Sequence, residues 1–236
     1  MMDEARGVIG VPAQDMSHTA FWKSYTGVEK PHGSVLICTE NVLTAVARNQ
    51  IVKGMLTYPR AEWLFFMDSD MLFPARALRH LLRRFERDHK PHVDIVGGTY
   101  FQRFEPHDII AYEQLGELAY RPLTTEWIDY ASKHRENVSL DGRFAGRIIG
   151  NDGLVEVGGI GTGCLLIRRK VLDVMAEPWF SYRDEGSEDL FFCREAKKAG
   201  FKIYLDMGLV CGHVSRVVVG PVHCLSANGE LRNAGS

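Results

Sequence analysis

The amino-acid sequence predicts an α/β fold in which helices flank a mostly parallel central sheet. In the first hundred residues, short apolar runs alternate with segments whose apolar residues recur at helical spacing, as in strand–helix–strand units with right-handed crossovers. The run WLFFM at positions 63–67 is apolar throughout, which is typical of a parallel strand covered on both faces. The 236 residues include no linker long enough to separate two domains, so one large domain is expected.

Strands and helices are expected to alternate as far as residue 99. Strands are expected at 8–12, 34–38, 63–68 and 93–99, and helices at 19–25, 41–57 and 76–90. The second of these helices has an apolar stripe made of Val42, Ala45, Val46, Val52 and Leu56. Asn49 lies inside that stripe, where a polar side chain needs a hydrogen-bond partner. The third helix carries five arginines opposite its leucines, which indicates a solvated face or, as the alternative, a surface for an anionic partner.

The pattern changes after residue 100. Residues 100–160 contain short strand-like pieces such as 108–112, polar loops and few clear helices. Later strands are expected at 161–168, 202–206 and 209–214, and helices at 170–175 and 188–199.

Composition and charge exclude several classes of protein. Hydrophobic residues make up 45% and charged residues 25%, which suits a chain that builds a core, and the formal net charge of −2 gives no general bias toward nucleic acid or anionic membranes. No apolar run approaches the roughly 18 residues that span a bilayer, and the start MMDEARGVIG is unlike a signal peptide. The five cysteines form no C-x-x-C pair, which argues against a zinc site or a disulfide framework. A cytoplasmic location is therefore expected.

Two carboxylates, Asp68 and Asp70, follow the buried run directly. If the chain stays extended there, the period of two places both on one side, at the carboxyl end of a parallel strand, where open α/β sheets bind ligands. Mg²⁺ and Mn²⁺ prefer carboxylate oxygens and often reach a protein through one or two acids plus substrate phosphates. The alternative is a surface turn in which Asp68 caps nearby backbone groups.

A second candidate feature is GSEDLFF at 186–192, which begins the late helix. Helical spacing places Asp189 on the inward face, in the first turn. The structural alternative is that Ser187 caps the helix while Glu188 and Asp189 suit its positive end. At that end the helix dipole is expected to lower the pKa of Asp189. His213, further on, follows a strand-like run, and a lone histidine is usually a satisfied core or surface residue.

Taken in order, six segments resemble the GT-A-fold glycosyltransferases, in particular the family 2-like sugar transferases and their compact bacteriophage-encoded relatives. The segments are VIGVPAQD, AVARNQIVKGML, FMDSDM, GGIGTGCLLIRR, GSEDLFF and CGHV, and the resemblance covers about residues 7–214. It implies a GT-A-like domain over 1–220, with a nucleotide-binding half at 1–100 and an acceptor and catalytic half at 101–220. The small, polar residues 221–236 are expected to form a flexible tail.

The resemblance also implies roles for single residues. Asp70, Asp68 and His213 would hold Mn²⁺ or Mg²⁺, and Asp189, with Glu188 beside it, would be the catalytic base. The nucleotide-sugar would contact the residues Pro12, Gln14, Arg48, Asn49, Asp68, Ser69, Gly161 and Thr162. Trp179 lies in an aromatic loop before the acid pair of the helix and is a candidate on the acceptor side, although core packing explains such aromatics more often.

The implied activity is the metal-dependent transfer of a sugar from a nucleotide-sugar, UDP- before GDP-linked, with inversion expected before retention. The acceptor stays open among proteins, glycans, lipid-linked glycans and nucleic acids, and a phage-encoded enzyme would act in the host cytoplasm. One alternative is a non-catalytic module that binds sugar or anionic surfaces on the same fold. A nucleotidyltransferase ranks lower, because GVIGVPAQDM lacks the Gly-rich loop with Arg and Lys that such enzymes usually carry.

Overall fold

The computed structural model describes residues 6–13, 17–86, 91–115, 120–138, 146–183, 186–215 and 218–219 of the chain. The helices are α1 (Thr19–Gly27), α2 (Thr44–Leu56), α3 (Ala77–Arg83), α4 (Thr124–Lys133), α5 (Arg169–Val174) and α6 (Glu188–Lys198). The strands are β1 (Gly7–Pro12), β2 (Ser34–Thr39), β3 (Trp63–Met67), β4 (Met71–Leu72), β5 (Ile95–Thr99), β6 (Ala111–Leu115), β7 (Tyr120–Pro122), β8 (Arg147–Ile148), β9 (Leu154–Val157), β10 (Gly159–Ile160), β11 (Cys164–Arg168), β12 (Ile203–Val210), β13 (Gly212–Val214) and β14 (Val218–Val219).

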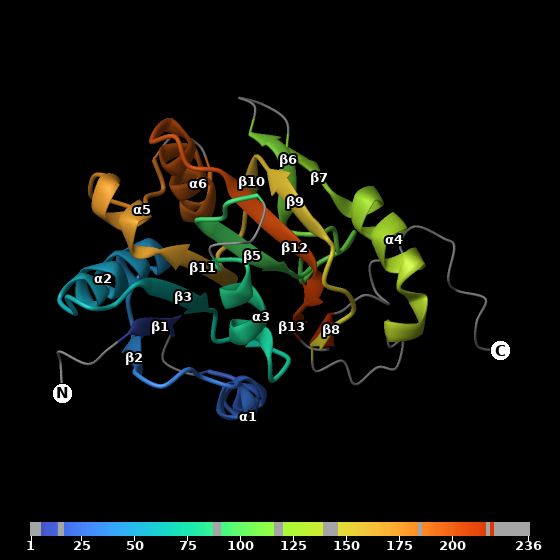
Figure 1. The fold of residues 1–236 in the computed structure, drawn as a ribbon, viewed down its shortest axis with the longest axis horizontal. Helices are drawn as coiled ribbons and strands as arrows, with labels where there is room; N and C mark the ends of the chain where they lie inside the picture. Colours follow the sequence, from blue (N-terminus) through green and yellow to red (C-terminus); the bar gives the residue numbers. More distant parts are fainter. Residues whose placement is uncertain are drawn as a thin grey trace.

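The central sheet is mixed, with strands in the order β2-β1-β3-β11-β5-β12-β8 and with β9 beside β12 (Figure 1). β1 pairs in parallel with β2 and β3, and β5 pairs in parallel with β12. β11 lies between β3 and β5 and is antiparallel to both, so β3 and β5 point the same way. The core of the sheet is therefore mostly parallel, as expected. The alternating pattern did not reveal the reversed strand β11 inside it, nor β8 and β9, which are antiparallel to β12.

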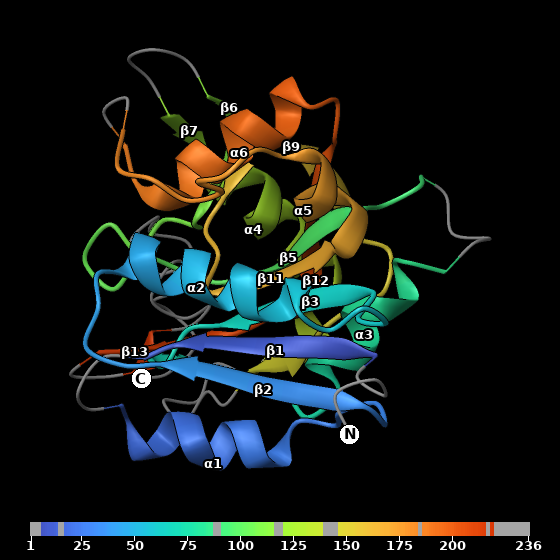
Figure 2. The ribbon, with the colours of Figure 1, turned by 90° about the vertical axis from the view of Figure 1, so that its left-hand side faces the viewer.

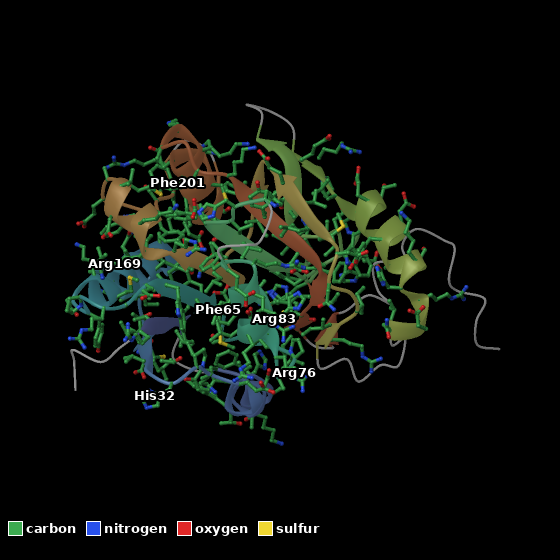
Figure 3. The ribbon with its side chains drawn as sticks, viewed as in Figure 1. His32, Phe65, Arg76, Arg83, Arg169 and Phe201 are labelled. Atoms are coloured by element: carbon green, nitrogen blue, oxygen red, sulfur yellow. The ribbon has the colours of Figure 1, made fainter. Side chains whose placement is uncertain are left out.

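Helices cover both faces of the sheet, which gives three layers (Figure 2). Side chains alternate between the two faces, because successive residues of a strand point to opposite sides. In β3, Leu64 and Phe66 pack with residues of α2, α5 and α6, whereas Phe65 and Met67 pack with residues of α1 and α3. Phe65 is among the side chains labelled in Figure 3. The fully apolar run at this position is thus explained by burial on both faces.

α2 follows its expected course, and Ala45, Val52 and Leu56 of the expected stripe face the core. The helix begins at Thr44, and the residues it buries are Ala45, Ala47, Arg48, Ile51, Val52 and Met55. The expectation that Val46 belongs to the apolar stripe is wrong, since 44% of this residue is exposed. Arg48 is buried instead, and its positive charge is paired with carboxylates of the candidate site described below.

Two short sheets lie beside the central one. β13 pairs with β4 and with β14, and β6 pairs with β10 and β7. The expected strand at 209–214 is divided between the end of β12 and β13. Residues 220–236 lie outside the described part of the chain, so the expected tail there stays a prediction. Within the described residues, no helix has the length and apolar character needed to cross a bilayer.

A buried charged cluster joins α3 to β12. Asp206, with no exposed surface, accepts a hydrogen bond from Nε of Arg84 at 2.9 Å and lies 2.8 Å from Nε2 of His80. Its other oxygen accepts from the backbone N–H groups of Gly208 and Leu209. Burial alone would raise the pKa of Asp206, but His80 and Arg84 outweigh it and lower that pKa. The expected arginine face is therefore wrong at Arg84, which turns inward to hold β12.

This cluster gives a prediction about stability. Asp206→Asn should lower the free energy of unfolding by about 3 kcal/mol, because it leaves the Arg84 charge buried without its counter-ion. Urea denaturation measures the change. Asp173→Asn, which removes an exposed partner of Arg169 on α5, is the matched control and should change stability by less than about 0.5 kcal/mol. A loss below about 1 kcal/mol for Asp206→Asn would show that the cluster is not needed for the fold.

Candidate functional site

A cavity of about 440 Å³ lies at the carboxyl ends of the parallel strands. Pro12 ends β1, the segment after β3 supplies Asp68, and the segment after β5 supplies Tyr100. Strands that point the same way end at the same edge of the sheet, so these segments meet although they are far apart in sequence. The cavity is lined by Pro12, His18, Thr44, Arg48, Asp68, Ser69, Asp70, Tyr100, Arg103, Ile110, Glu188, Asp189 and His213.

The two acids after β3 lie in a turn and not in an extended segment. The backbone N–H of Met71 donates to the carbonyl oxygen of Asp68 at 3.1 Å, which closes the turn. The chain therefore does not stay extended at D-x-D and adopts a turn, which was the alternative, but both carboxylates line the cavity. The turn directs them to different partners, Asp68 to a side chain of α2 and Asp70 to side chains from β13 and from the segment after β5.

The pairing of β4 with β13 brings His213 to Asp70. His213 is opposite Met71 in this antiparallel pair, and the backbone N–H of Val214 donates to the carbonyl oxygen of Asp70 at 2.7 Å. As a result, Nε2 of His213 lies 3.5 Å from Oδ2 of Asp70. The same carboxylate oxygen lies 3.0 Å from a terminal nitrogen of Arg103.

The orientation of the His213 ring is set from its other side. Nδ1 lies 2.8 Å from the carbonyl oxygen of Phe101, and a carbonyl oxygen can only accept, so Nδ1 carries the hydrogen. Nε2, which faces Asp70, then carries the lone pair that could bind a metal ion. Burial would raise the pKa of Asp70, but His213 and Arg103 outweigh it and lower that pKa, which keeps the carboxylate ionised.

Arg48 is the central cation of the site. Its side chain is 2% exposed, and its two terminal nitrogens bind the two oxygens of Asp68 at 2.9 and 3.1 Å. Its Nε lies 3.5 Å from Glu188 and 3.6 Å from Asp189. Burial would lower the pKa of Arg48, but the three carboxylates raise it well above its ordinary value. One guanidinium therefore neutralises acids from two distant segments of the chain.

Asp189 lies at the start of α6, where Ser187 accepts a hydrogen bond from the backbone N–H of Leu190 and caps the helix as expected. The hydroxyl of Thr162 donates to Asp189. The pKa of Asp189 is raised to about 6: burial raises it most, Arg48 and Thr162 lower it, and Glu188 raises it. The expectation of a lowered pKa is therefore wrong, because removal from water and a neighbouring carboxylate outweigh the helix dipole and the guanidinium.

Several expected site residues do not line the cavity. Both polar groups of Asn49 bind the backbone of Phe180, and its amide also donates to the carbonyl oxygen of Ala45. Trp179 is 6% exposed and donates from its indole N–H to the carbonyl oxygen of Leu172, so it is a core residue without a face open to an acceptor.

Of the other expected residues, Gly161 and Thr162 lie near the cavity but do not line it, and Gln14 is outside the described residues. Gly161 lies so close to Tyr100 that an added Cβ would come within 2.1 Å of the phenol oxygen. Thr162 is buried and acts through its hydrogen bond to Asp189.

The residues around Asp70 fit part of a divalent metal site. No set of three or more His, Cys, Asp or Glu side chains among the described residues forms a ready-made ligand cluster. Asp70 and His213 nevertheless offer an oxygen and a nitrogen 3.5 Å apart, and the hydrogen bond from Nδ1 to Phe101 is the outer-shell contact that ligating histidines usually make. Mg²⁺ and Mn²⁺ commonly take one or two protein groups plus phosphate and water. Asp68, held by Arg48, is turned toward α2.

Five residues line the cavity without having been expected there: His18, Thr44, Tyr100, Arg103 and Ile110. Two of them come from one segment. Tyr100 and Arg103 follow β5, and the phenol oxygen of Tyr100 accepts a hydrogen bond from the backbone N–H of Gly163 at 3.0 Å. Burial raises the pKa of Tyr100 well above its ordinary value, and Asp189 and Asp68 raise it further, so the phenol stays neutral. Their position after a parallel strand was the available signal, because the carboxyl ends of such strands meet at the site.

Comparison with known proteins shows the fold. No protein-family model matches the sequence, and no curated protein matches it significantly. Among solved structures, the chain is similar to the crystal structure of A197 from STIV, with a TM-score of 0.61 and 17% sequence identity over 92% of this chain and 90% of that chain. The expected GT-A-like α/β fold, with a mostly parallel core and flanking helices, is thereby confirmed.

The contacts of Asn49 predict a structural role. Asn49→Ala should lower the free energy of unfolding by about 2 kcal/mol, because two backbone groups of the buried Phe180 lose their partners. Urea denaturation measures this loss, and Ser132→Ala, at an exposed helical hydroxyl, is the control. Unchanged stability in Asn49→Ala would show that these contacts are not needed for the fold.

Proposed function

We propose that the protein is a metal-dependent glycosyltransferase that moves a sugar from a nucleotide-sugar to an acceptor hydroxyl. One observation carries this proposal. The fold brings Asp68, Asp70, His213 and Asp189 from three distant segments to one cavity at the carboxyl ends of the parallel strands. The fold's likeness to A197 from STIV is consistent with the proposal, which rests on the site.

In this proposal the donor's diphosphate lies beside Asp70. Asp70 and His213 would hold Mn²⁺ or Mg²⁺, which would neutralise the negative charge that grows on the diphosphate as it leaves. The chain's own contribution is to keep Asp70 ionised and to fix His213 through Phe101. Pro12, Arg48, Asp68 and Ser69 would form the nucleotide side of the cavity, since they line it at the ends of β1 and β3 and on α2.

Asp189 is the proposed base of an inverting reaction. The acceptor oxygen attacks the sugar C1, its proton passes to Asp189, and the bond from C1 to the diphosphate oxygen breaks with its electron pair on the leaving nucleoside diphosphate. A carboxylate with a pKa of about 6 is a stronger base than an ordinary aspartate and is still ionised at neutral pH. Thr162 and Arg48 fix its position.

The proposal also covers the donor and the acceptor. A UDP-sugar is the first choice of donor and a GDP-sugar the second, and the acceptor is a protein, a glycan, a lipid-linked glycan or a nucleic acid. A non-catalytic module that binds sugar or anions is the competing function, and a nucleotidyltransferase is a weaker one. The polar character of the cavity suits all three functions. The raised pKa of Asp189, in the same cavity as Asp68 and Asp70, favours the transferase.

The donor prediction is tested with purified protein by thermal shift and calorimetry against UDP-, GDP-, CMP- and dTDP-sugars, each with Mn²⁺, Mg²⁺ or EDTA. One nucleotide class should bind, and only with metal. Asp70→Ala should weaken that binding at least about 10-fold, because it removes one of two protein groups at the proposed metal site. Asp173→Ala, an exposed acid outside this cavity, is the control. Binding that persists in EDTA would contradict the metal requirement.

The role of Asp189 predicts a pH dependence. With a pKa of about 6, Asp189 ionises as the pH rises, so kcat/KM should be level above about pH 7 and fall roughly tenfold per unit below about pH 5. Asp189→Asn should lower turnover at least about 100-fold while donor binding persists. Glu188→Gln should move the acidic limb to lower pH, because it removes a neighbouring negative charge that raises this pKa. Full turnover in Asp189→Asn would exclude the base assignment.

A further inference from the structure

Three groups compete for one oxygen atom in the cavity. Oδ2 of Asp70 lies 3.0 Å from Arg103, and Nε2 of His213 lies 3.5 Å from the same oxygen. A divalent ion held by Asp70 and His213 would have to approach this oxygen as well. Such an ion and the guanidinium are both positive, so they repel each other when both lie beside the same carboxylate oxygen. Arg103 and a metal ion are therefore alternative partners of Asp70.

The charge of the cavity shows why a mobile cation matters there. Among the described lining residues, four carboxylates face two guanidiniums, which leaves an excess of negative charge when the histidines are neutral. A nucleoside diphosphate is itself negative, so it needs cations that can turn toward it. Arg48 is unsuited to this task, because its side chain is 2% exposed and it already faces three carboxylates.

Arg103 has the freedom that Arg48 lacks. Its side chain is 44% exposed, and its guanidinium forms an ion pair with Asp70. Its backbone stands at the base of a loop that is fixed by a hydrogen bond from the N–H of Gln102 to the carbonyl oxygen of Asp108 and by the bridge between Phe101 and Ile109. The side chain can thus turn about its own bonds while its Cα stays at the rim of the cavity.

We propose that Arg103 is an exchangeable counter-ion. Without ligand it neutralises Asp70; when a divalent ion takes Asp70 and His213, its guanidinium moves onto the diphosphate of the donor. The inference rests on the proposed function for the identity of that donor. The planar guanidinium can bind two phosphate oxygens at once. Arg103 would therefore bind the donor, and it would also compete with the metal ion for Asp70.

The test measures two affinities that this exchange moves in opposite directions. Calorimetry is run first with Mn²⁺ alone and then with UDP, and separately GDP, at saturating Mn²⁺. Arg103→Gln should bind Mn²⁺ about threefold more tightly, because the competing cation is gone. It should bind the nucleoside diphosphate about 10-fold more weakly, because a charge-assisted contact is lost. Arg103→Lys should be intermediate in both measurements, since it keeps the charge without the fork.

Arg79→Gln is the matched control. Arg79 is also an exposed arginine with one carboxylate partner, Glu29, but it lies on α3 outside the cavity, and both affinities should stay at the wild-type value. Two losses together in Arg103→Gln would show that Arg103 only supports the site, and an unchanged Mn²⁺ affinity would exclude the competition. Both outcomes overturn the inference.

The failure of the proposed function gives a different result. A wild-type protein that binds Mn²⁺ but neither UDP nor GDP overturns the donor assignment and the second half of the exchange. The Mn²⁺ affinity of Arg103→Gln then still decides whether Arg103 and the metal compete for Asp70. A wild-type protein that binds no Mn²⁺ overturns the exchange outright.

Discussion

The buried guanidinium of Arg48 holds the two parts of the candidate site together. It binds Asp68 through both terminal nitrogens, and its Nε faces Glu188 and Asp189 at the start of α6. Three carboxylates that lie close together repel one another unless a cation lies between them. The acid turn after β3 and the first turn of α6 can approach each other because α2 places this cation between them.

The sheet supplies the second constraint, since it decides which segments meet at the cavity. β1, β3 and β5 end at one edge, and the reversed strand β11 carries the chain back between β3 and β5. The loop that enters β11 thereby passes the cavity, where Gly163 binds Tyr100 and Thr162 binds Asp189. The small β4–β13 pair then sets His213 against Asp70. The site is thus assembled by backbone pairing, and its side chains make only the final contacts.

Much of the fold could be predicted from local patterns, and much of the site could not. The apolar run of β3 and the helical stripes depend on burial, which a short window of sequence records directly. The antiparallel direction of β11 depends on pairing with strands about 70 to 100 residues away, and its own sequence carries no sign of direction. Asp68, Asp70, Glu188, Asp189 and His213 were expected at the site and line its cavity. Arg48 was expected on the nucleotide side, but its pairing with three of these acids, and the pairing of Arg103 with Asp70, depend on tertiary contacts. Trp179 was expected on the acceptor side, because an aromatic loop has the same sequence pattern whether it packs inward or faces a ligand.

Asp189 shows how a tertiary environment can reverse what a local rule implies. A carboxylate at a helix N-terminus should have a lowered pKa, since the dipole stabilises its charge by a modest amount. Burial acts in the opposite sense and is larger here, and Glu188 adds a second negative charge at the same helix end, so the pKa rises to about 6. Arg48 limits this rise, because a guanidinium close to both acids favours their ionised forms. The residue that allows the acids to come together therefore also keeps Asp189 ionised at neutral pH, which is the state a proton acceptor needs.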